Sequence, residues 1–220
     1  VRPGVSALNL DALAFKLITE NGDKPAFLHY KPQCAIRPFP NTLCVSINDA
    51  VVHGIPRGDQ ILQDGDTVGL DLGMSHKGMF TDSAIRVVVG AISKEDNRLL
   101  EATKEALYLG IKAARGGNRI GDIGHAIQFS IEKAGFGLVE ELGGHGLGHK
   151  AHEPPEVPNL GIAGTGRKLE PGMVLAIEPI VNAGSGDIIL DSDKWTIRTR
   201  DGSRSCQFEH TILITEGEAE

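Results

Sequence analysis

The stretch TVGLDLGMSHKGMFTDSAIRVVV, residues 67–89, decides the fold that we expect. Its first half alternates apolar residues from Val68 to Leu72, and a turn follows near Ser75–Gly78. Its second half ends in the apolar run Ile85–Val89. Two apolar segments joined by a short turn are typical of an antiparallel hairpin. The hairpin is therefore the first element of the predicted structure.

Helical signals lie on both sides of this hairpin. Ser6 is placed to cap a first helix, which ends at Asn21-Gly22. A second helix is predicted from Ser93 to Gly116-Gly117, and a third over residues 121–135. The apolar stripe expected on the first helix comprises Leu8, Leu10, Leu13, Leu17 and Ile18.

Strand patterns fill most of the remaining chain. Residues 25–47 indicate short strands and loops, and three later strands are predicted at Met173–Val181, Trp195–Thr199 and Gln207–Thr215. Asp201-Gly202 is a hairpin turn signal between the last two. Helices and strands in this order favour an α+β fold, in which an antiparallel sheet carries helices on one face.

Carboxylates occur where side chains should be buried. Asp71, Glu178 and Glu209 each lie within or beside an apolar strand pattern. Asp82 follows Asp71 across the predicted hairpin turn, so both can share one face. A single buried carboxylate can be explained by a backbone turn or a partner arginine. Several of them, with few basic residues nearby, favour a bound cation.

One histidine has an unusual setting. His145 stands in GGHGLG, residues 143–148, and His152 follows it closely. Glycines let backbone and ligands approach an imidazole, although a lone histidine is more often structural. Four carboxylates with one imidazole and no thiolate favour manganese, iron or cobalt over structural zinc. Two such ions roughly 3.5–4 Å apart can share a hydroxide, which attacks amides or esters.

Composition excludes several classes of function. The 220 residues carry a net charge of −7 and no basic stripe, so we expect no nucleic-acid binding. Three cysteines, Cys34, Cys44 and Cys206, are too few for a disulfide framework and are consistent with a reducing cytoplasm. No apolar run or leader predicts membrane insertion or export. We expect a single domain over residues 1–220 and a monomer.

Five short motifs carry a resemblance that covers the chain. The sequence resembles the type I methionine aminopeptidases in segments that occur in the family's order. They are SINDAVVHGIP at residues 46–56, GHGLG at 144–148, HEP at 152–154, IEP at 177–179 and FEHT at 208–211. The resemblance implies the pita-bread α+β fold, with a curved antiparallel sheet, helices on its outer face and halves related by a pseudo-twofold.

The resemblance also implies roles for the charged residues. Asp71 would chelate one metal ion, Asp82 and Glu209 would bridge two, and His145 and Glu178 would hold the second. The ions would be cobalt, manganese or iron(II). Glu178 would also shuttle a proton. His53 would bind substrate, and His152 would hydrogen-bond the scissile carbonyl.

Substrate contacts follow from the same resemblance. Tyr30, Phe39, Cys44 and Trp195 match the residues that line the methionine pocket. Trp195 also has a simpler interpretation as a core tryptophan. The family's monovalent cation would lie near Asn48 and Ser205.

Three departures from the family affect what we expect. Residues 31–38 form a longer loop than in typical bacterial members, which leaves the side-chain preference of the pocket open. Ala151 replaces a bulky aromatic residue, which would widen the pocket entrance. We expect the helix that usually precedes the first residue in the family to be missing, and apolar surface to be exposed as a result.

The expected activity is removal of the initiator methionine from nascent proteins with small second residues, in the cytoplasm and near ribosomes. A prolidase or aminopeptidase P is the alternative enzyme, although these carry a large extra N-terminal domain. A type II enzyme would have an insertion between His145 and Glu178, which are only 33 positions apart. The remaining alternative is an inactive module that binds protein or RNA, but such modules typically lose metal ligands.

Overall fold

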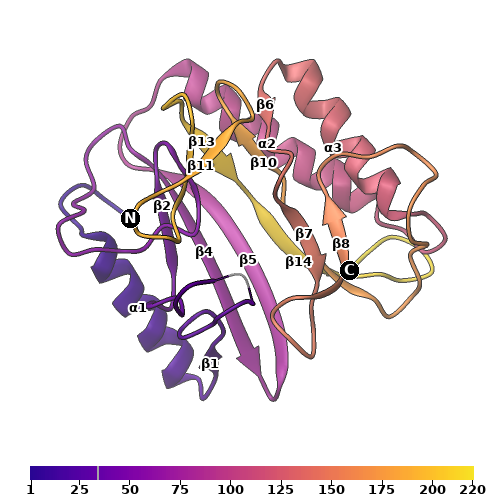
Figure 1. The fold of residues 1–220 in the computed structure, drawn as a ribbon, viewed down its shortest axis with the longest axis horizontal. Coiled ribbons are helices and arrows are strands. Elements are labelled where there is room, and N and C mark those ends of the chain that lie inside the picture. The colour runs from indigo at the N-terminus through magenta and orange to yellow at the C-terminus, as the bar shows by residue number, and fades with distance from the viewer. Residues whose placement is uncertain (34) are drawn as a thin grey trace.

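The computed structural model describes residues 1–33 and 35–220, and in these residues helices pack against antiparallel sheets (Figure 1). The helices are α1 Ala7–Glu20, α2 Lys94–Ala113 and α3 Ile120–Ala134. The α+β class is therefore confirmed. Within the part of the chain that the structure describes, none of these helices is long and apolar enough to cross a membrane.

The strands form one large sheet and two small ones. In chain order they are β1 Lys24–Pro25, β2 Cys44–Ile47, β3 Ala50–Val52, β4 Thr67–His76, β5 Met79–Val88, β6 Gly137–Leu138, β7 Gly143–Gly146, β8 Glu153–Pro158, β9 Val174–Ile177, β10 Ile180–Asn182, β11 Ile188–Leu190, β12 Ile197–Thr199, β13 Ser205–Gln207 and β14 Glu209–Leu213. The eight-stranded sheet has the order β1-β4-β5-β14-β9-β7-β8, and β2 also pairs with β4. The small sheets are β13-β10-β6 and β11-β12-β3.

The hairpin β4–β5 is the longest pairing in the described residues. It runs in continuous register from Thr67 opposite Val88 to His76 opposite Met79. Lys77 and Gly78 form the two-residue turn, with φ of 50° and 86°. Positive φ at both positions matches the twist of the flanking strands, which explains why glycine stands at the second position. The predicted hairpin is confirmed.

Two other predicted strands are each divided in the structure. The segment predicted over residues 173–181 breaks at Glu178-Pro179 into β9 and β10, and the segment over 207–215 breaks at Phe208. At the first break the chain passes from the large sheet to the sheet of β13, β10 and β6, and at the second it passes from that small sheet into the large one. Pro179 cannot donate a ladder hydrogen bond, which is one physical reason for the break. The prediction of single strands was wrong here.

The predicted hairpin around Asp201-Gly202 was also wrong. The chain does turn there, but β12 pairs with β11 and β3, and β13 pairs with β10 and leads into β14. A local turn signal identifies a reversal and does not determine which strand the next segment will join.

Helix α1 begins and ends as predicted but faces the sheet with different residues. Ser6 and Asn9 form a capping box, and Asn21 is the C-cap. Ala7, Ala14 and Ile18 are buried, whereas the leucines at positions 8, 13 and 17 are 44%, 52% and 53% exposed. Of the predicted stripe, Ile18 is buried and Leu10 packs against the core, but the other three leucines were placed on the wrong face. Small residues on the buried face bring the helix close to the sheet. Because leucines occur on several sides of the helix, their spacing does not show which side is buried.

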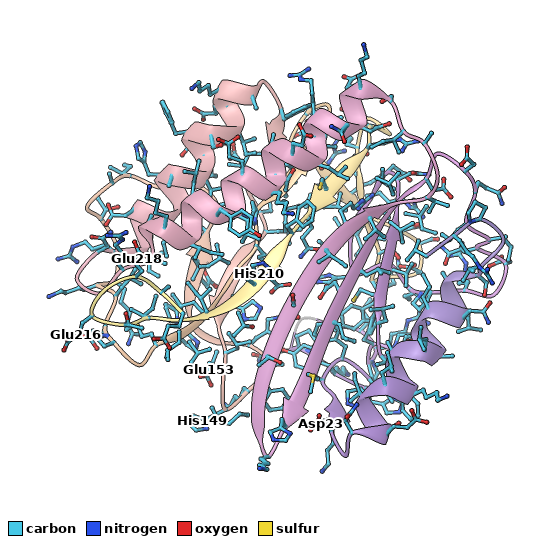
Figure 2. The ribbon with its side chains drawn as sticks, turned by 180° about the vertical axis from the view of Figure 1, so that it is seen from behind. Asp23, His149, Glu153, His210, Glu216 and Glu218 are labelled. Atoms are coloured by element: carbon cyan, nitrogen blue, oxygen red, sulfur yellow. The ribbon has the colours of Figure 1, made fainter. Side chains whose placement is uncertain are left out.

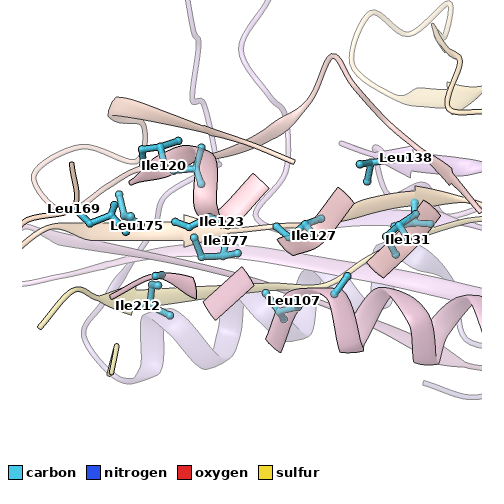
Figure 3. Close-up of a cluster of buried hydrophobic side chains, with 14 of the residues drawn as sticks. Leu107, Ile120, Ile123, Ile127, Ile131, Leu138, Leu169, Leu175, Ile177 and Ile212 are labelled. Carbon is cyan, nitrogen blue, oxygen red and sulfur yellow. The ribbon is translucent and has the colours of Figure 1, made fainter. Parts of the chain in front are cut away.

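The main core lies between the sheet and the pair of helices α2 and α3. Seen from behind, the helices lie in front of the strands, so all three cover the same face of the sheet (Figure 2). Leu107 of α2 and the isoleucines of α3 pack onto Leu175, Ile177 and Ile212 (Figure 3). A smaller cluster under α1 includes Val45, Leu62 and Val68. These layers leave the opposite face of the sheet free to carry the polar side chains described next.

Candidate metal centre

Three carboxylates surround one alanine on neighbouring strands. Ala84 of β5 stands opposite Asp71 of β4 on one side and opposite Glu209 of β14 on the other. Side chains directly opposite one another point to the same face of a sheet. Asp82 lies on that face too, two positions before Ala84, and pairs with Gly73. The sheet register therefore gathers three acids around a small side chain.

These acids lack the partners that buried charges need. Asp71, Asp82 and Glu209 are 8%, 5% and 2% exposed. One carboxylate oxygen of Asp71 and one of Asp82 accept no hydrogen bond. Within the part of the chain that is described, no lysine or arginine pairs with any of the three. Carboxylates in this state fit a divalent cation bound among them.

Burial has a large effect on how these groups titrate. It raises the pKa of Asp71 to about 7. Burial also raises the pKa values of Asp82, Glu178 and Glu209 well above their ordinary range, and charges on neighbouring carboxylates raise them further. Without a counter-ion, the cluster would hold protons at neutral pH.

His145 and Glu178 approach this cluster from the far side. His145 lies on β7 opposite Ala176, and Glu178 directly follows β9. The imidazole Nε2 of His145 is 3.9 Å from a Glu178 oxygen. Its Nδ1 is 2.9 Å from the carbonyl oxygen of Gly146, which can only accept, so Nδ1 carries the proton. The Nε2 lone pair is therefore free to bind a metal ion.

The candidate ligands form two groups that have one residue in common. Asp71, Asp82 and Glu209 offer oxygens within 4.8 Å of one another, as do ligand atoms of His145, Glu178 and Glu209. Glu209 thus belongs to both groups. Two neighbouring sites with a common carboxylate suit a pair of ions, and the oxygen-rich donor set suits hard or intermediate divalent metals.

Two amides that the sequence analysis did not identify hold Glu178. Gln207 donates to its Oε2 at 3.0 Å, and Asn159 donates to its backbone carbonyl at 2.9 Å. Both act at the point where β9 ends. Gln207 directly precedes the FEHT motif, but neither amide has a pattern of its own in the sequence.

His152 lies between the two sides of the site. Its ring stacks on Tyr30 with centroids 5.2 Å apart, and the His145 centroid is 4.0 Å away. Burial, together with the neighbouring His145 and His53, lowers its pKa to about 3. Burial also lowers the pKa of His53 to about 4. Both imidazoles are therefore neutral at physiological pH and can donate or accept hydrogen bonds.

All eleven residues predicted for the site line one cavity of about 260 Å³. Phe27, Pro32 and Gln207 also line it, and the sequence analysis did not name them as site residues. A wider cleft of about 600 Å³ shares His53, His145, His152 and Glu178 with this cavity. The arrangement is a small pocket next to the metal ligands, opening into a larger groove.

Other predictions for the pocket have mixed outcomes. Trp195 lines the cavity and packs edge-on against Phe39 at 5.2 Å, so the core interpretation alone does not describe it. Ala151 is buried and is not among the described residues that line either cavity. Cys34 of the longer loop lies outside the described residues, whereas Pro32 of that loop reaches the cavity.

The place predicted for a monovalent cation contains a side chain instead. The Asn48 carbonyl accepts hydrogen bonds from the Ser205 amide at 3.0 Å and from the Arg86 guanidinium at 2.7 Å. The residues present do not fit an additional small cation at this carbonyl, because a positive group already occupies it.

Comparison with known proteins agrees with this site. The family model described as metallopeptidase family M24 matches residues 1–216. A methionine aminopeptidase of Aquifex aeolicus is 46% identical over 98% of this chain and 84% of its own length. The crystal structure of a methionine aminopeptidase from Thermotoga maritima superposes with a TM-score of 0.96, at 39% identity, over 100% of this chain and 86% of the other.

The chain therefore belongs to metallopeptidase family M24. Its relatives place it among the methionine aminopeptidases of that family, with the pita-bread fold. A prolidase from Pyrococcus furiosus shares the fold at a TM-score of 0.76 and only 23% identity, and this chain covers 56% of it. That second likeness concerns the fold alone.

Proposed function

We propose that this chain removes the N-terminal methionine of proteins by hydrolysis at two divalent metal ions held by Asp71, Asp82, His145, Glu178 and Glu209. The observation that carries the proposal is the group of unpaired buried carboxylates beside a small, mostly apolar cavity. The substrates would be the N-termini of newly made chains in the cytoplasm, preferably with small second residues.

The metal ligands divide between the two sides of the site. Asp71 belongs to the group on β4, β5 and β14, whereas His145 and Glu178 belong to the group at the end of β9. Glu209 is common to both groups, and Asp82 lies within ligand distance of His145 as well as Asp71. These placements support Asp82 and Glu209 as the bridging residues. Manganese, iron(II) or cobalt ions in this cradle would supply Lewis acidity and lower the pKa of a bound water.

Glu178 is suited to moving a proton. Gln207 occupies one of its oxygens, and the other faces His145. Its buried position beside the proposed metal ligands would place a carboxylate next to a water bound to the ions, as a general base and acid requires. Glu178 would take a proton from the attacking water and deliver it to the leaving amine.

The neutral histidines would position the scissile bond. His152 lies beside His145, within reach of ligand atoms of Asp82, so its N–H can donate to a carbonyl bound next to the metal ligands. Such a bond strengthens as the carbonyl oxygen gains charge in the transition state. His53 lines the same cavity and packs edge-on against Trp195 at 6.2 Å, which supports a role beside the N-terminal residue of the substrate.

The cavity is suited to one unbranched apolar side chain. Phe27, Phe39, Trp195 and Cys44 surround it, and its volume of about 260 Å³ falls below the usual range for drug-sized ligands. The wider cleft next to it would hold the following residues of the substrate.

Peptide cleavage tests the proposal. The purified chain, supplied separately with manganese, iron(II) or cobalt, should release methionine from Met-Ala-Ser and leave Xaa-Pro peptides intact. Cleavage of Xaa-Pro peptides alone would assign the chain to the prolidase reaction. Absence of both metal binding and cleavage would favour the protein- or RNA-binding module.

A further inference from the structure

Arg86 carries a buried positive charge that has no carboxylate partner. It lies on β5, four positions beyond Asp82, and is only 3% exposed. Among the ion pairs of the described residues none includes Arg86. A guanidinium is costly to bury, so its surroundings must replace the water that it has lost.

Backbone carbonyls provide that replacement. Nη2 donates to the carbonyl oxygen of Asn48 at 2.7 Å, and Nη1 donates to that of Ala50 at 3.2 Å. Thr67 accepts through its carbonyl at 3.4 Å and through its hydroxyl at 3.3 Å. The guanidinium is thus held by uncharged oxygens from three residues.

The acids closest to Arg86 are engaged elsewhere. Asp49 pairs with Arg198 at 2.9 Å, and Asp96 lies 3.4 Å from Arg204. Burial lowers the pKa of Arg86 to about 10, which leaves it charged at neutral pH. Oxygens without charge around one positive charge are the environment in which proteins hold a monovalent cation, whereas a divalent cation needs carboxylates.

The carbonyls belong to segments that support the reactive residues. Asn48 lies in the turn between β2 and β3 with φ of 55°, and its carbonyl also accepts from Ser205 of β13. Strand β3 leads directly to His53, which has φ of 57°. One guanidinium therefore ties the turn before His53 to the hairpin that carries Asp71 and Asp82.

We propose that Arg86 is a built-in substitute for a bound monovalent cation. Its guanidinium takes the place near Asn48 and Ser205 where the family resemblance led us to expect a sodium or potassium ion. Arg86 is a positioning residue, because it touches neither the metal ligands nor the pocket and acts through the β2–β3 turn. The consequence is an enzyme whose stability and activity do not depend on monovalent cations.

The first test uses the unaltered protein loaded with manganese. Melting temperature and kcat/KM on Met-Ala-Ser are compared in potassium, sodium and tetramethylammonium chloride at equal ionic strength. Both quantities should be the same in all three salts. A clear increase with potassium or sodium over tetramethylammonium would overturn the proposal. The activity readout rests on the proposed function, but the melting temperature does not, so failures of the two can be distinguished.

The second test removes the guanidinium. In tetramethylammonium chloride, Arg86→Met should lower kcat/KM roughly tenfold, because buried carbonyls lose their partner. Potassium should restore most of the loss and raise the melting temperature. Arg119→Met is the matched control, since Arg119 also donates to a carbonyl, that of Gly166 at 2.8 Å, but at an exposed site. The control should show no dependence on the salt.

Thallium(I) is a direct probe of the vacated place. Its NMR signal should shift on binding to Arg86→Met and remain unshifted with the unaltered protein. If Arg86→Met folds in neither salt, Arg86→Lys replaces it, because an ammonium ion keeps the charge and should keep the independence from salt. A folded Arg86→Met that binds no thallium and ignores potassium would overturn the proposal.

Discussion

The two sides of the metal centre hold the same kind of side chain in different ways. On the hairpin side, Asp71 and Asp82 lie within long regular strands, and the ladder fixes both positions. On the other side, Glu178 lies in the break between β9 and β10, where the ladder is interrupted, and Glu209 is the first residue of β14, directly after the break at Phe208. At Glu178, the side-chain amides of Gln207 and Asn159 supply the hydrogen bonds that the interrupted ladder does not. In a regular strand the ladder register is therefore enough to position a carboxylate, whereas a carboxylate at a bend needs hydrogen bonds from other side chains.

Removal of a carboxylate common to both sides should have the largest effect. We expect Asp82→Ala or Glu209→Ala to reduce methionine release to background, because each change would remove a carboxylate that is proposed to bridge the two metal positions. Metal content measured on the dialysed protein should fall as well. Asp59→Ala, at an exposed position, is the control. Normal activity in either site variant would disprove the assignment of two shared metal ions.

His152 packs against His145, and its ligand atom lies within 4.8 Å of one of Asp82, so its loss tests how the two sides cooperate. We expect His152→Ala to lower kcat by about a hundredfold, with a smaller change in KM, because its hydrogen bond strengthens in the transition state. Steady-state kinetics on Met-Ala-Ser would measure both constants. A change in KM alone would show that the bond contributes equally to ground-state binding.

A matched pair of variants compares the bend with the ladder directly. Gln207→Ala removes the bond to Glu178, and we expect kcat to fall about tenfold, with a shift in the acidic limb of its pH profile. Thr211→Val removes the hydroxyl that bonds the Asp82 backbone at 2.9 and 2.7 Å. This second change should lower the melting temperature and leave the pH profile unchanged. Equal pH profiles in the two variants would contradict the inference that Glu178 depends on its side-chain partner while Asp82 is positioned by the strand ladder.

Metal-free protein should show the smallest effect, in its response to pH. Burial raises the pKa of Asp71 to about 7 in the folded state, above its value of about 4 in the unfolded chain. A raised pKa contributes stability that is fully present below the unfolded value and is lost as pH rises through the folded value. We therefore expect the melting temperature in EDTA to fall between pH 4 and pH 7, by roughly 10 °C.

Two controls accompany the pH experiment. Asp71→Asn should flatten the fall, because it removes one titrating group. Added manganese should reverse the slope, since metal binding requires deprotonated carboxylates and strengthens as pH rises. A metal-free protein that becomes more stable from pH 4 to pH 7 would contradict the assignment of unpaired buried acids.

The difference between hairpin and bend also explains how much could be predicted from sequence. The alternating pattern and Lys77-Gly78 turn define β4 and β5, so the shared face of Asp71 and Asp82 could be predicted. The pattern around Glu178 is equally apolar, but it does not show that the strand changes sheets at Pro179. The same limitation made the hairpin at Asp201-Gly202 wrong.

Other features depend on contacts between distant segments. Gln207, Asn159 and Arg86 act through hydrogen bonds to residues 19 to 38 positions away, and single polar residues leave no periodic signal. The face of α1 could not be read because its leucines lie on several sides. The candidate carboxylate ligands could be identified because each has a local signal, namely an acidic residue within or beside an apolar strand pattern.

Ala84 has no reactive group, yet the geometry of the centre depends on it. It stands between Asp71 and Glu209 with 2% of its surface exposed, on the face where the acids converge. We expect a larger side chain to crowd the space among the acids that are proposed to bind the ions, without changing any of those acids. We therefore expect the space among the acids to limit substitution of Ala84, and no side chain larger than its methyl group to be accepted there.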